Sequence, residues 1–190
     1  MLHFGVARRE LKTRRTILIT LHRRENQGDV IRSATEIISN LANTYNADYR
    51  WIFIKHPNPN VQNSYNSDFL NNQNIDFQDP IPYPKMLKEL RSASLLITDS
   101  GGFQEEATFL GLPTLVLRRT TERREALEEG CCLLVPNPQE ELEMLVINLL
   151  KNNGGKYDQM SHPSHVFGVG NSAEAILKIL QGIEFVGAKS

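Results

Sequence analysis

The sequence predicts an α/β protein with a doubly wound parallel sheet, that is, a Rossmann-like three-layer domain. The first observation behind this prediction is that short, apolar, strand-like runs alternate with longer segments of helical periodicity. The second is that polar clusters directly follow several of the apolar runs. Parallel strands joined by helical crossovers produce this alternation, and such sheets bind ligands at the carboxyl ends of their strands.

In the first half of the chain, composition and spacing define each element. Residues 16–21 are β-rich, and four consecutive large apolar residues make 49–55 a buried strand. Apolar side chains recur with helical spacing between positions 29 and 45. In chain order we expect strand 16–21, helix 29–45, strand 49–55, helix 60–70, strand 75–77 and helix 83–92.

The second half repeats the pattern. Pro113 precedes a short apolar run, and residues 139–151 form a clear amphipathic helix. In chain order we expect strand 95–98, helix 102–110, strand 114–117, helix 122–128, strand 132–135, helix 139–151 and helix 173–180.

Composition limits the classes of function. The 190 residues suffice for one domain, with 40% hydrophobic residues and a net charge of −1, so nothing global favours nucleic acid or an anionic membrane surface as partner. The apolar runs are too short for membrane insertion, and the N-terminus is not a convincing signal peptide. Cys131 and Cys132 are adjacent, which disfavours a disulfide and fits a cytoplasmic location. We expect a basic tail or linker at 1–15, the domain at 16–182 and a C-terminal tail at 183–190.

The most informative segment is Asp-Ser-Gly-Gly-Phe-Gln-Glu-Glu at residues 99–106. It follows an apolar run and opens a helix, where free backbone N–H groups and the helix dipole suit an anion such as phosphate. Carboxylates in the following turn can accept hydrogen bonds from sugar hydroxyls, which together suggests a nucleotide or nucleotide-sugar. The alternative is a plain tight turn that uses glycine dihedrals, with Ser100 as the N-cap and Glu105 or Glu106 favoured only by the dipole.

Three further polar clusters follow predicted strands, at residues 22–26, 56–60 and 118–123. They converge with the Ser-Gly-Gly segment on one edge of the predicted sheet. Arginines suit bidentate contacts to phosphate, and a histidine can act as an acid, a base or a neutral donor. The alternative for Arg23, Arg24 and Glu25 is a solvated salt-bridge cluster.

The ordered set of motifs resembles the C-terminal half of the non-hydrolysing UDP-N-acetylglucosamine 2-epimerases. The resemblance runs from about residue 16 to about residue 180, and it is carried by His-Arg-Arg-Glu-Asn at 22–26, His-Pro-Asn-Pro at 56–59, Thr-Asp-Ser-Gly-Gly-Phe-Gln-Glu-Glu-Ala at 98–107 and Thr-Thr-Glu-Arg at 120–123. It implies one half of a glycosyltransferase-B-type fold. It also implies that UDP-GlcNAc and UDP-ManNAc are interconverted by elimination and re-addition of UDP, without metal or nicotinamide, in cell-surface polysaccharide biosynthesis.

The resemblance also implies roles for single residues. Ser100, Gly101 and Gly102 would cradle phosphate, and Glu106 would hold the ribose hydroxyls. The remaining implied positions are Arg123 at the diphosphate, Arg23 and His56 as further UDP-binding residues, and His22 as the catalytic residue at the sugar–phosphate junction.

Three positions depart from the family pattern. Leu21 stands where the family usually has Gly, and Arg124 stands where Pro commonly follows Thr-Thr-Glu-Arg. Val169 replaces an acidic residue in a late loop, which puts a contact from that loop in doubt.

The family's acid/base residues lie mostly on an N-terminal half, and no such half precedes residue 16. Glu25, Glu105 and Glu122 are available carboxylates, but nothing in the sequence gives any of them the role of base. That half is either cut away, supplied as a separate subunit or lost; the final helix, 173–180, would cross towards it. Half of a two-subunit glycosyltransferase and a non-catalytic UDP-sugar-binding module remain alternatives, and homo-oligomer formation stays open.

Overall fold

A computed structural model describes residues 14–23, 26, 28–65 and 67–182. Its centre is a six-stranded, all-parallel sheet with strand order β3-β2-β1-β4-β5-β6. The strands are β1 Arg15–Thr20, β2 Tyr49–Ile54, β3 Ile75–Gln78, β4 Ala93–Thr98, β5 Thr114–Val116 and β6 Cys132–Leu134. The direction of winding reverses between β1 and β4, and this switch point is where doubly wound sheets leave a crevice for ligands.

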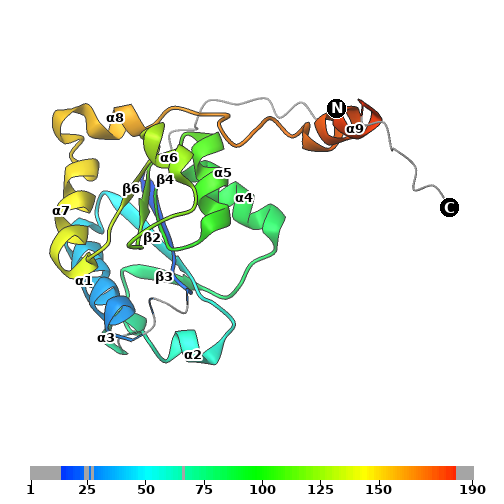
Figure 1. The fold of residues 1–190 in the computed structure, drawn as a ribbon. Coiled ribbons are helices and arrows are strands. Elements are labelled where there is room, and N and C mark those ends of the chain that lie inside the picture. The colour runs from blue at the N-terminus through cyan, green and yellow to red at the C-terminus, as the bar shows by residue number, and fades with distance from the viewer. Residues whose placement is uncertain (1–13, 24–25, 27, 66, 183–190) are drawn as a thin grey trace.

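Helices cover both faces of the sheet (Figure 1). α1 and α7 lie on one face, and α4 and α5 lie on the other. α9 stands apart from the sheet at the end of an extended segment. The helices are α1 Asp29–Tyr45, α2 Pro59–Gln62, α3 Ser67–Leu70, α4 Tyr83–Ser92, α5 Gly101–Leu110, α6 Arg124–Glu128, α7 Pro138–Leu150, α8 Lys156–Met160 and α9 Ser172–Gly182, with a short 3-10 helix at Asn153–Gly155.

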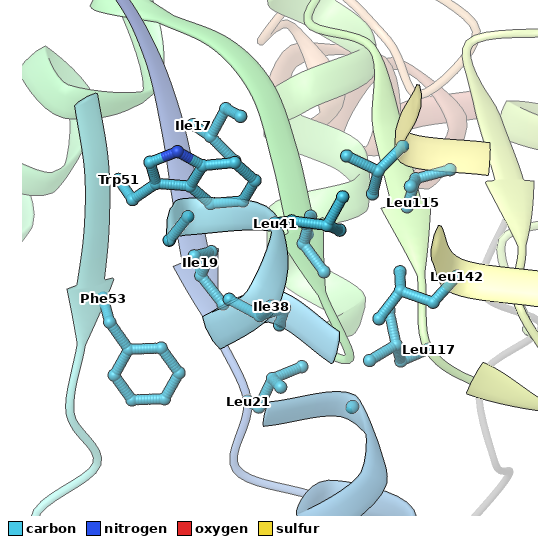
Figure 2. Packing of buried hydrophobic residues seen from close by; sticks show 14 of the residues in the cluster. Ile17, Ile19, Leu21, Ile38, Leu41, Trp51, Phe53, Leu115, Leu117 and Leu142 are labelled. Carbon is cyan, nitrogen blue, oxygen red and sulfur yellow. The ribbon is translucent and has the colours of Figure 1, made fainter. Parts of the chain in front are cut away.

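The strands divide their side chains between two cores because successive residues of a strand point to opposite faces. Trp51 and Phe53 of β2 pack in the core beneath α1 and α7, whereas Ile52, between them, packs in the core beneath α4 and α5. Figure 2 shows the first core, in which Ile38 and Leu41 of α1 meet the sheet. A sheet buried on both faces is the three-layer arrangement expected from the near-continuous apolar strands.

The predicted fold class is therefore confirmed, and each predicted strand is present. A single helix at 60–70 is wrong, because the chain forms α2 and α3 there instead. The segment is rich in Asn and Ser, whose side chains bond to nearby backbone and compete with a continuous helix; the Asn58 side chain accepts from the Asn60 N–H at 3.0 Å. α8 was not predicted.

The predicted N-terminal tail lies outside the described residues up to position 13, and Arg15 is already the first residue of β1. The predicted C-terminal tail at 183–190 also lies outside them. Among the helices of the described part, none has the length and apolar character needed to cross a membrane.

Candidate functional site

The loop that follows β1 is held in place by the carboxylate of Asp99, at the end of β4. Asp99 is 0% exposed and accepts hydrogen bonds from the backbone N–H groups of His22, at 3.1 Å to each oxygen, and Arg23, at 2.9 Å. Asn26 Nδ2 donates to Asp99 at 3.1 Å and also to the Leu117 carbonyl at 2.8 Å. One buried carboxylate thus joins the carboxyl ends of β1, β4 and β5 around the switch point, a role that sequence reasoning missed.

Ser100, Gly101 and Gly102, which we call the anion cradle, open α5 beside this loop. Ser100 is the N-cap residue of α5, as the alternative interpretation had it, and is extended, but its side chain makes no capping bond to the helix. Both glycines lie inside the helix and neither has a positive φ. A Cβ on Gly101 would lie 3.2 Å from the Arg123 guanidinium, so this glycine serves close approach rather than an unusual dihedral.

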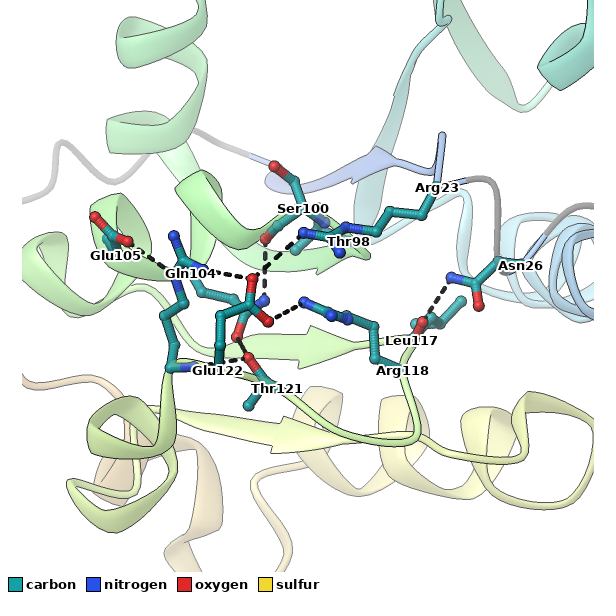
Figure 3. Close-up of polar contacts among 11 residues, drawn as sticks. Arg23, Asn26, Thr98, Ser100, Gln104, Glu105, Leu117, Arg118, Thr121 and Glu122 are labelled. Carbon is teal, nitrogen blue, oxygen red and sulfur yellow. Dashed lines mark hydrogen bonds and ion pairs between the residues drawn. The ribbon is translucent and has the colours of Figure 1, made fainter.

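Arginines and carboxylates from the loops after β1 and β5 and from α5 meet in front of the cradle (Figure 3). Glu122 pairs with Arg118 at 2.8 Å, with Arg23 at 3.5 Å and, in close contact, with Arg123. Arg123 also pairs with Glu105 at 2.8 Å. A hydrogen bond from its own backbone N–H, followed by the Arg118 guanidinium, lowers the pKa of Glu122. These five side chains carry three positive and two negative charges, so the cluster favours an anion.

Gln104 fixes the Thr-Thr-Glu-Arg segment against α5. Its Oε1 accepts from the buried Thr121 hydroxyl at 2.7 Å, and its Nε2 donates to the Ser100 carbonyl at 3.1 Å. Thr121 Oγ1 in turn accepts from the backbone N–H of Arg123 at 3.1 Å. The position of Arg123 over the cradle is therefore set by a buried hydrogen-bond chain, which the sequence motif alone does not reveal.

Glu105 and Glu106 differ sharply in their surroundings. Glu105 is engaged by Arg123, whereas Glu106 Oε1 accepts a 2.7 Å hydrogen bond from the Tyr83 hydroxyl. Glu106 Oε2 is buried and has no hydrogen-bond partner among the described residues. Burial raises the pKa of Glu106. Glu106 therefore keeps one buried acceptor, Oε2, that a ligand hydroxyl could bond.

The two histidines at the ends of β1 and β2 stack on each other. The rings of His22 and His56 have centroids 5.1 Å apart and an interplanar angle of 15°. His22 Nδ1 lies 3.4 Å from Thr20 Oγ1 and 3.7 Å from Asp99 Oδ1. Burial lowers the pKa of His22, against the raising effect of Asp99. His22 is thus a neutral hydrogen-bonding group near neutral pH.

Each described cluster named from the sequence follows a strand of the observed sheet, at its carboxyl edge: His22 and Arg23 follow β1, His56 follows β2, Ser100, Gly101, Gly102 and Glu106 follow β4, and Arg123 follows β5. Arg24 and Glu25 lie outside the described residues. In the part of the chain that the structure describes, no group of three or more His, Cys, Asp or Glu side chains is arranged to hold a metal ion.

The three departures from the family pattern have separate outcomes. The Leu21 side chain is 1% exposed and packs in the core, while its carbonyl accepts from the Tyr65 hydroxyl at 3.0 Å. Its bulk therefore does not enter the site. Arg124 begins α6, and Val169 is 63% exposed.

Comparisons with known proteins agree with this geometry. Residues 3–181 match the sequence profile of the UDP-N-acetylglucosamine 2-epimerase family. A UDP-N-acetylglucosamine 2-epimerase from Salmonella borreze is 35% identical over 172 residues, which is 90% of this chain and 45% of the relative.

Solved structures of the same family are also similar to this chain. The UDP-GlcNAc 2-epimerase from Neisseria meningitidis bound to UDP-GlcNAc superposes with a TM-score of 0.83 at 33% identity, covering 90% of this chain and 45% of that one. The Methanocaldococcus jannaschii UDP-GlcNAc 2-epimerase in complex with UDP-GlcNAc and UDP gives a TM-score of 0.70 at 29% identity, covering 90% and 46%. The chain thus spans a little under half the length of the relatives that it matches.

Proposed function

The chain belongs to the UDP-N-acetylglucosamine 2-epimerase family, and on that premise we propose that it acts as the UDP-binding half of an enzyme that interconverts UDP-GlcNAc and UDP-ManNAc. The observation that carries the proposal is the joint presence, at one sheet edge, of an anion cradle, an arginine cluster and a carboxylate oxygen that has no hydrogen-bond partner in the described part of the chain. A nucleoside diphosphate needs donors for its phosphates and an acceptor for its ribose. We assign this domain to residues 16–182.

In this proposal the residues act at separate parts of the ligand. Ser100 and the backbone N–H groups of Gly101 and Gly102 bind phosphate at the start of α5, and the Glu106 carboxylate accepts from the ribose hydroxyls. The Ser100 N–H itself donates to Thr98 Oγ1 at 3.0 Å, which leaves the Ser100 hydroxyl as the donor of that residue. Arg123 and Arg23 supply charge to the diphosphate, which involves exchange of their bonds to Glu122 for bonds to phosphate.

In the same proposal His22 is the residue at the sugar–phosphate junction, and His56, whose ring stacks on it, is a further UDP-binding residue. Elimination of UDP builds negative charge on the leaving diphosphate, and preorganised donors lower the barrier to that step. Because burial lowers the pKa of His22, its contribution is a neutral hydrogen bond. The stabilising positive charge therefore comes from the arginines and the α5 terminus.

A base at C2 is the part of the reaction that these residues do not supply. Glu105 and Glu122 are both ion-paired to arginines, which disfavours either as the base, and Glu25 is outside the described residues. We infer that a second half provides the acid/base groups, by analogy with the remaining length of the relatives. α9 offers it an apolar face of Ile176, Leu177, Ile179 and Leu180, each at least half exposed. The free, buried cysteines Cys131 and Cys132 support a cytoplasmic location.

Calorimetric titration of the chain with UDP tests the binding claim. We expect weak but measurable binding, and Arg123→Ala should weaken it by about 1.5–3 kcal/mol because a charged hydrogen bond to phosphate is lost. Absence of binding heat at millimolar UDP would contradict the proposal, and an unchanged affinity in Arg123→Ala would remove this residue from the site.

Activity is tested by mixing the chain with a separately produced N-terminal half of a family member and UDP-GlcNAc. Formation of UDP-ManNAc only in the mixture is expected. Robust turnover by the purified chain alone would contradict the half-site proposal, and sugar transfer to an acceptor would indicate a glycosyltransferase.

A further inference from the structure

Tyr83, the first residue of α4, bonds to the carboxylate beside the anion cradle. Its hydroxyl donates a 2.7 Å hydrogen bond to Glu106 Oε1, joining α4 to α5 across 23 positions of sequence. The Tyr83 side chain is 57% exposed, so burial in the core does not hold it there. The two helices lie on the same face of the sheet (Figure 1).

The bond to Tyr83 engages one carboxylate oxygen and leaves the other available. Glu106 Oε2 is buried and, among the described residues, has no hydrogen-bond partner. Buried acceptors are almost always paired in folded proteins, so such an oxygen is suited to a donor that arrives with a ligand. Fixing Oε1 restricts rotation of the carboxylate and so determines where Oε2 points.

The spacing along α5 places this oxygen at a useful position. Glu106 follows Gly102 by four residues, so the two share a helix face and lie about 6 Å apart along the axis. A Cβ on Gly102 would meet nothing within 4 Å, so this part of the face is open. A ligand with phosphate at the cradle therefore passes along an open surface towards Glu106.

We propose that Tyr83 is a positioning residue that orients the Glu106 carboxylate towards the ribose hydroxyls of the nucleotide. The inference rests on the proposed UDP-binding function and adds to it the residue that prepares the ribose contact. Tyr83 acts through Glu106 and makes no contact with the phosphates.

Charge supports the same assignment. Burial raises the pKa of Glu106, while the Tyr83 hydrogen bond lowers it by favouring the charged form. That hydrogen bond to Glu106 also raises the pKa of Tyr83, so the phenol stays protonated as a donor. Without the Tyr83 hydroxyl the pKa of Glu106 is higher. On acidification the Glu106 carboxylate is then protonated, and its bond to the ribose is lost, at a higher pH.

Titration of the full chain and its Tyr83→Phe variant with two ligands tests the proposal. UDP carries phosphates and ribose, whereas inorganic pyrophosphate carries phosphates alone. We expect Tyr83→Phe to weaken UDP binding about threefold to tenfold, the effect of one hydrogen bond, and to leave pyrophosphate binding unchanged. When the pH is lowered, the variant should also lose UDP binding with a midpoint at a higher pH than the parent chain.

Tyr157→Phe is the matched control. It also removes a tyrosine hydroxyl, one that donates to the Ser94 carbonyl at 3.0 Å near the opposite end of β4. Its UDP affinity should equal that of the parent chain.

Two results would overturn the inference: an unchanged UDP affinity in Tyr83→Phe, or an equal loss for UDP and pyrophosphate, which would indicate a general structural role. Failure of the parent chain to bind UDP would instead overturn the proposed function on which the inference rests.

Discussion

Glu122 lies among three guanidiniums, in the place where our proposal puts a ligand phosphate. Its side chain is 47% exposed and those of Arg23 and Arg123 are 30% and 27% exposed, so its pairs with these two arginines are weak and exchangeable. The carboxylate keeps the arginines close together when no ligand is bound, but it also competes with phosphate for them.

We therefore expect Glu122→Gln to bind UDP more tightly, by about twofold to fivefold, because the amide keeps the size of the side chain and removes the competing charge. Calorimetry on the variant measures this, with Glu128→Gln at the end of the following helix, α6, as the control for loss of one negative charge. Weaker binding in Glu122→Gln would mean that the carboxylate mainly aligns the arginines.

The burial of His22 makes the stability of the fold depend on pH. Burial lowers its pKa below the ordinary value of 6.5, so the unfolded chain takes up a proton before the folded one does. The stability that follows from this difference is fully present above pH 6.5 and is lost as the pH falls through the lower, folded-state pKa.

Urea unfolding at several pH values between 7.5 and 5 should show that the free energy of unfolding of His22→Gln depends less on pH than that of the parent chain. His165→Gln, which removes an exposed histidine outside the site, should keep the parent's dependence. Parallel curves for His22→Gln and the parent would contradict the assignment.

At this scale, sequence motifs predicted the candidate binding side chains but not the residues that position them. Asp99, Gln104 and Tyr83 work through partners that lie far along the chain, such as the 77 positions between Asp99 and His22. A single sequence carries no direct signal for such pairs. Asp99 and Gln104 both belong to the segment 99–106 singled out in the sequence, but that segment assigned a positioning role to neither.

At the scale of single elements, α5 depends on a glycine at its C-terminus. Gly111 has φ +62°, and a Cβ there would lie 2.7 Å from backbone atoms of His162 and Pro163. Backbone cannot move aside as a flexible side chain can. The end of α5 is therefore pressed against the segment that leads to α9.

We expect Gly111→Ala to lower the free energy of unfolding by about 2–4 kcal/mol, combining left-handed strain of about 1 kcal/mol with the backbone clash. Gly130→Ala separates the two causes, because Gly130 has φ +72° and an added Cβ there would meet nothing within 4 Å. This variant should lower the free energy of unfolding by the left-handed strain alone. Chemical denaturation measures both, and equal losses would contradict a role for the clash.

Element prediction succeeded where periodicity and tertiary packing agree. α1 and α4 have the predicted bounds because their apolar spacing matches the faces that they bury. It failed at residues 60–70, where Tyr65 and Phe69 are buried at helical spacing but the first helix already ends at Gln62. Asn63 and Ser64, which follow it, favour local side-chain bonds over a continuous helix, and the Ser64 hydroxyl donates to the Asn60 carbonyl at 3.1 Å.

For the molecule as a whole, the sheet order brings separate loops to one edge of the sheet, and in our proposal the described residues form one wall of a site. The apolar face of α9 is the complementary feature, because Ile176, Leu177, Ile179 and Leu180 are 50–64% exposed together. Such a continuous apolar stripe on a helix is normally covered by another surface. In Figure 1 this helix and α7 lie at opposite ends of the molecule.

Charging the α9 stripe should therefore separate binding from assembly. In the variant Ile176→Asp/Ile179→Asp, we expect UDP affinity to stay at the parental value, since neither side chain reaches the anion cradle. Restoration of epimerase activity by a separately produced N-terminal half should fall at least tenfold, because two charges would be buried in the contact. The matched control is Met144→Asp, where the side chain is also 56% exposed but lies on α7, at the other end of the molecule from α9. If the α9 variant and the control restore activity equally well, the second half docks elsewhere.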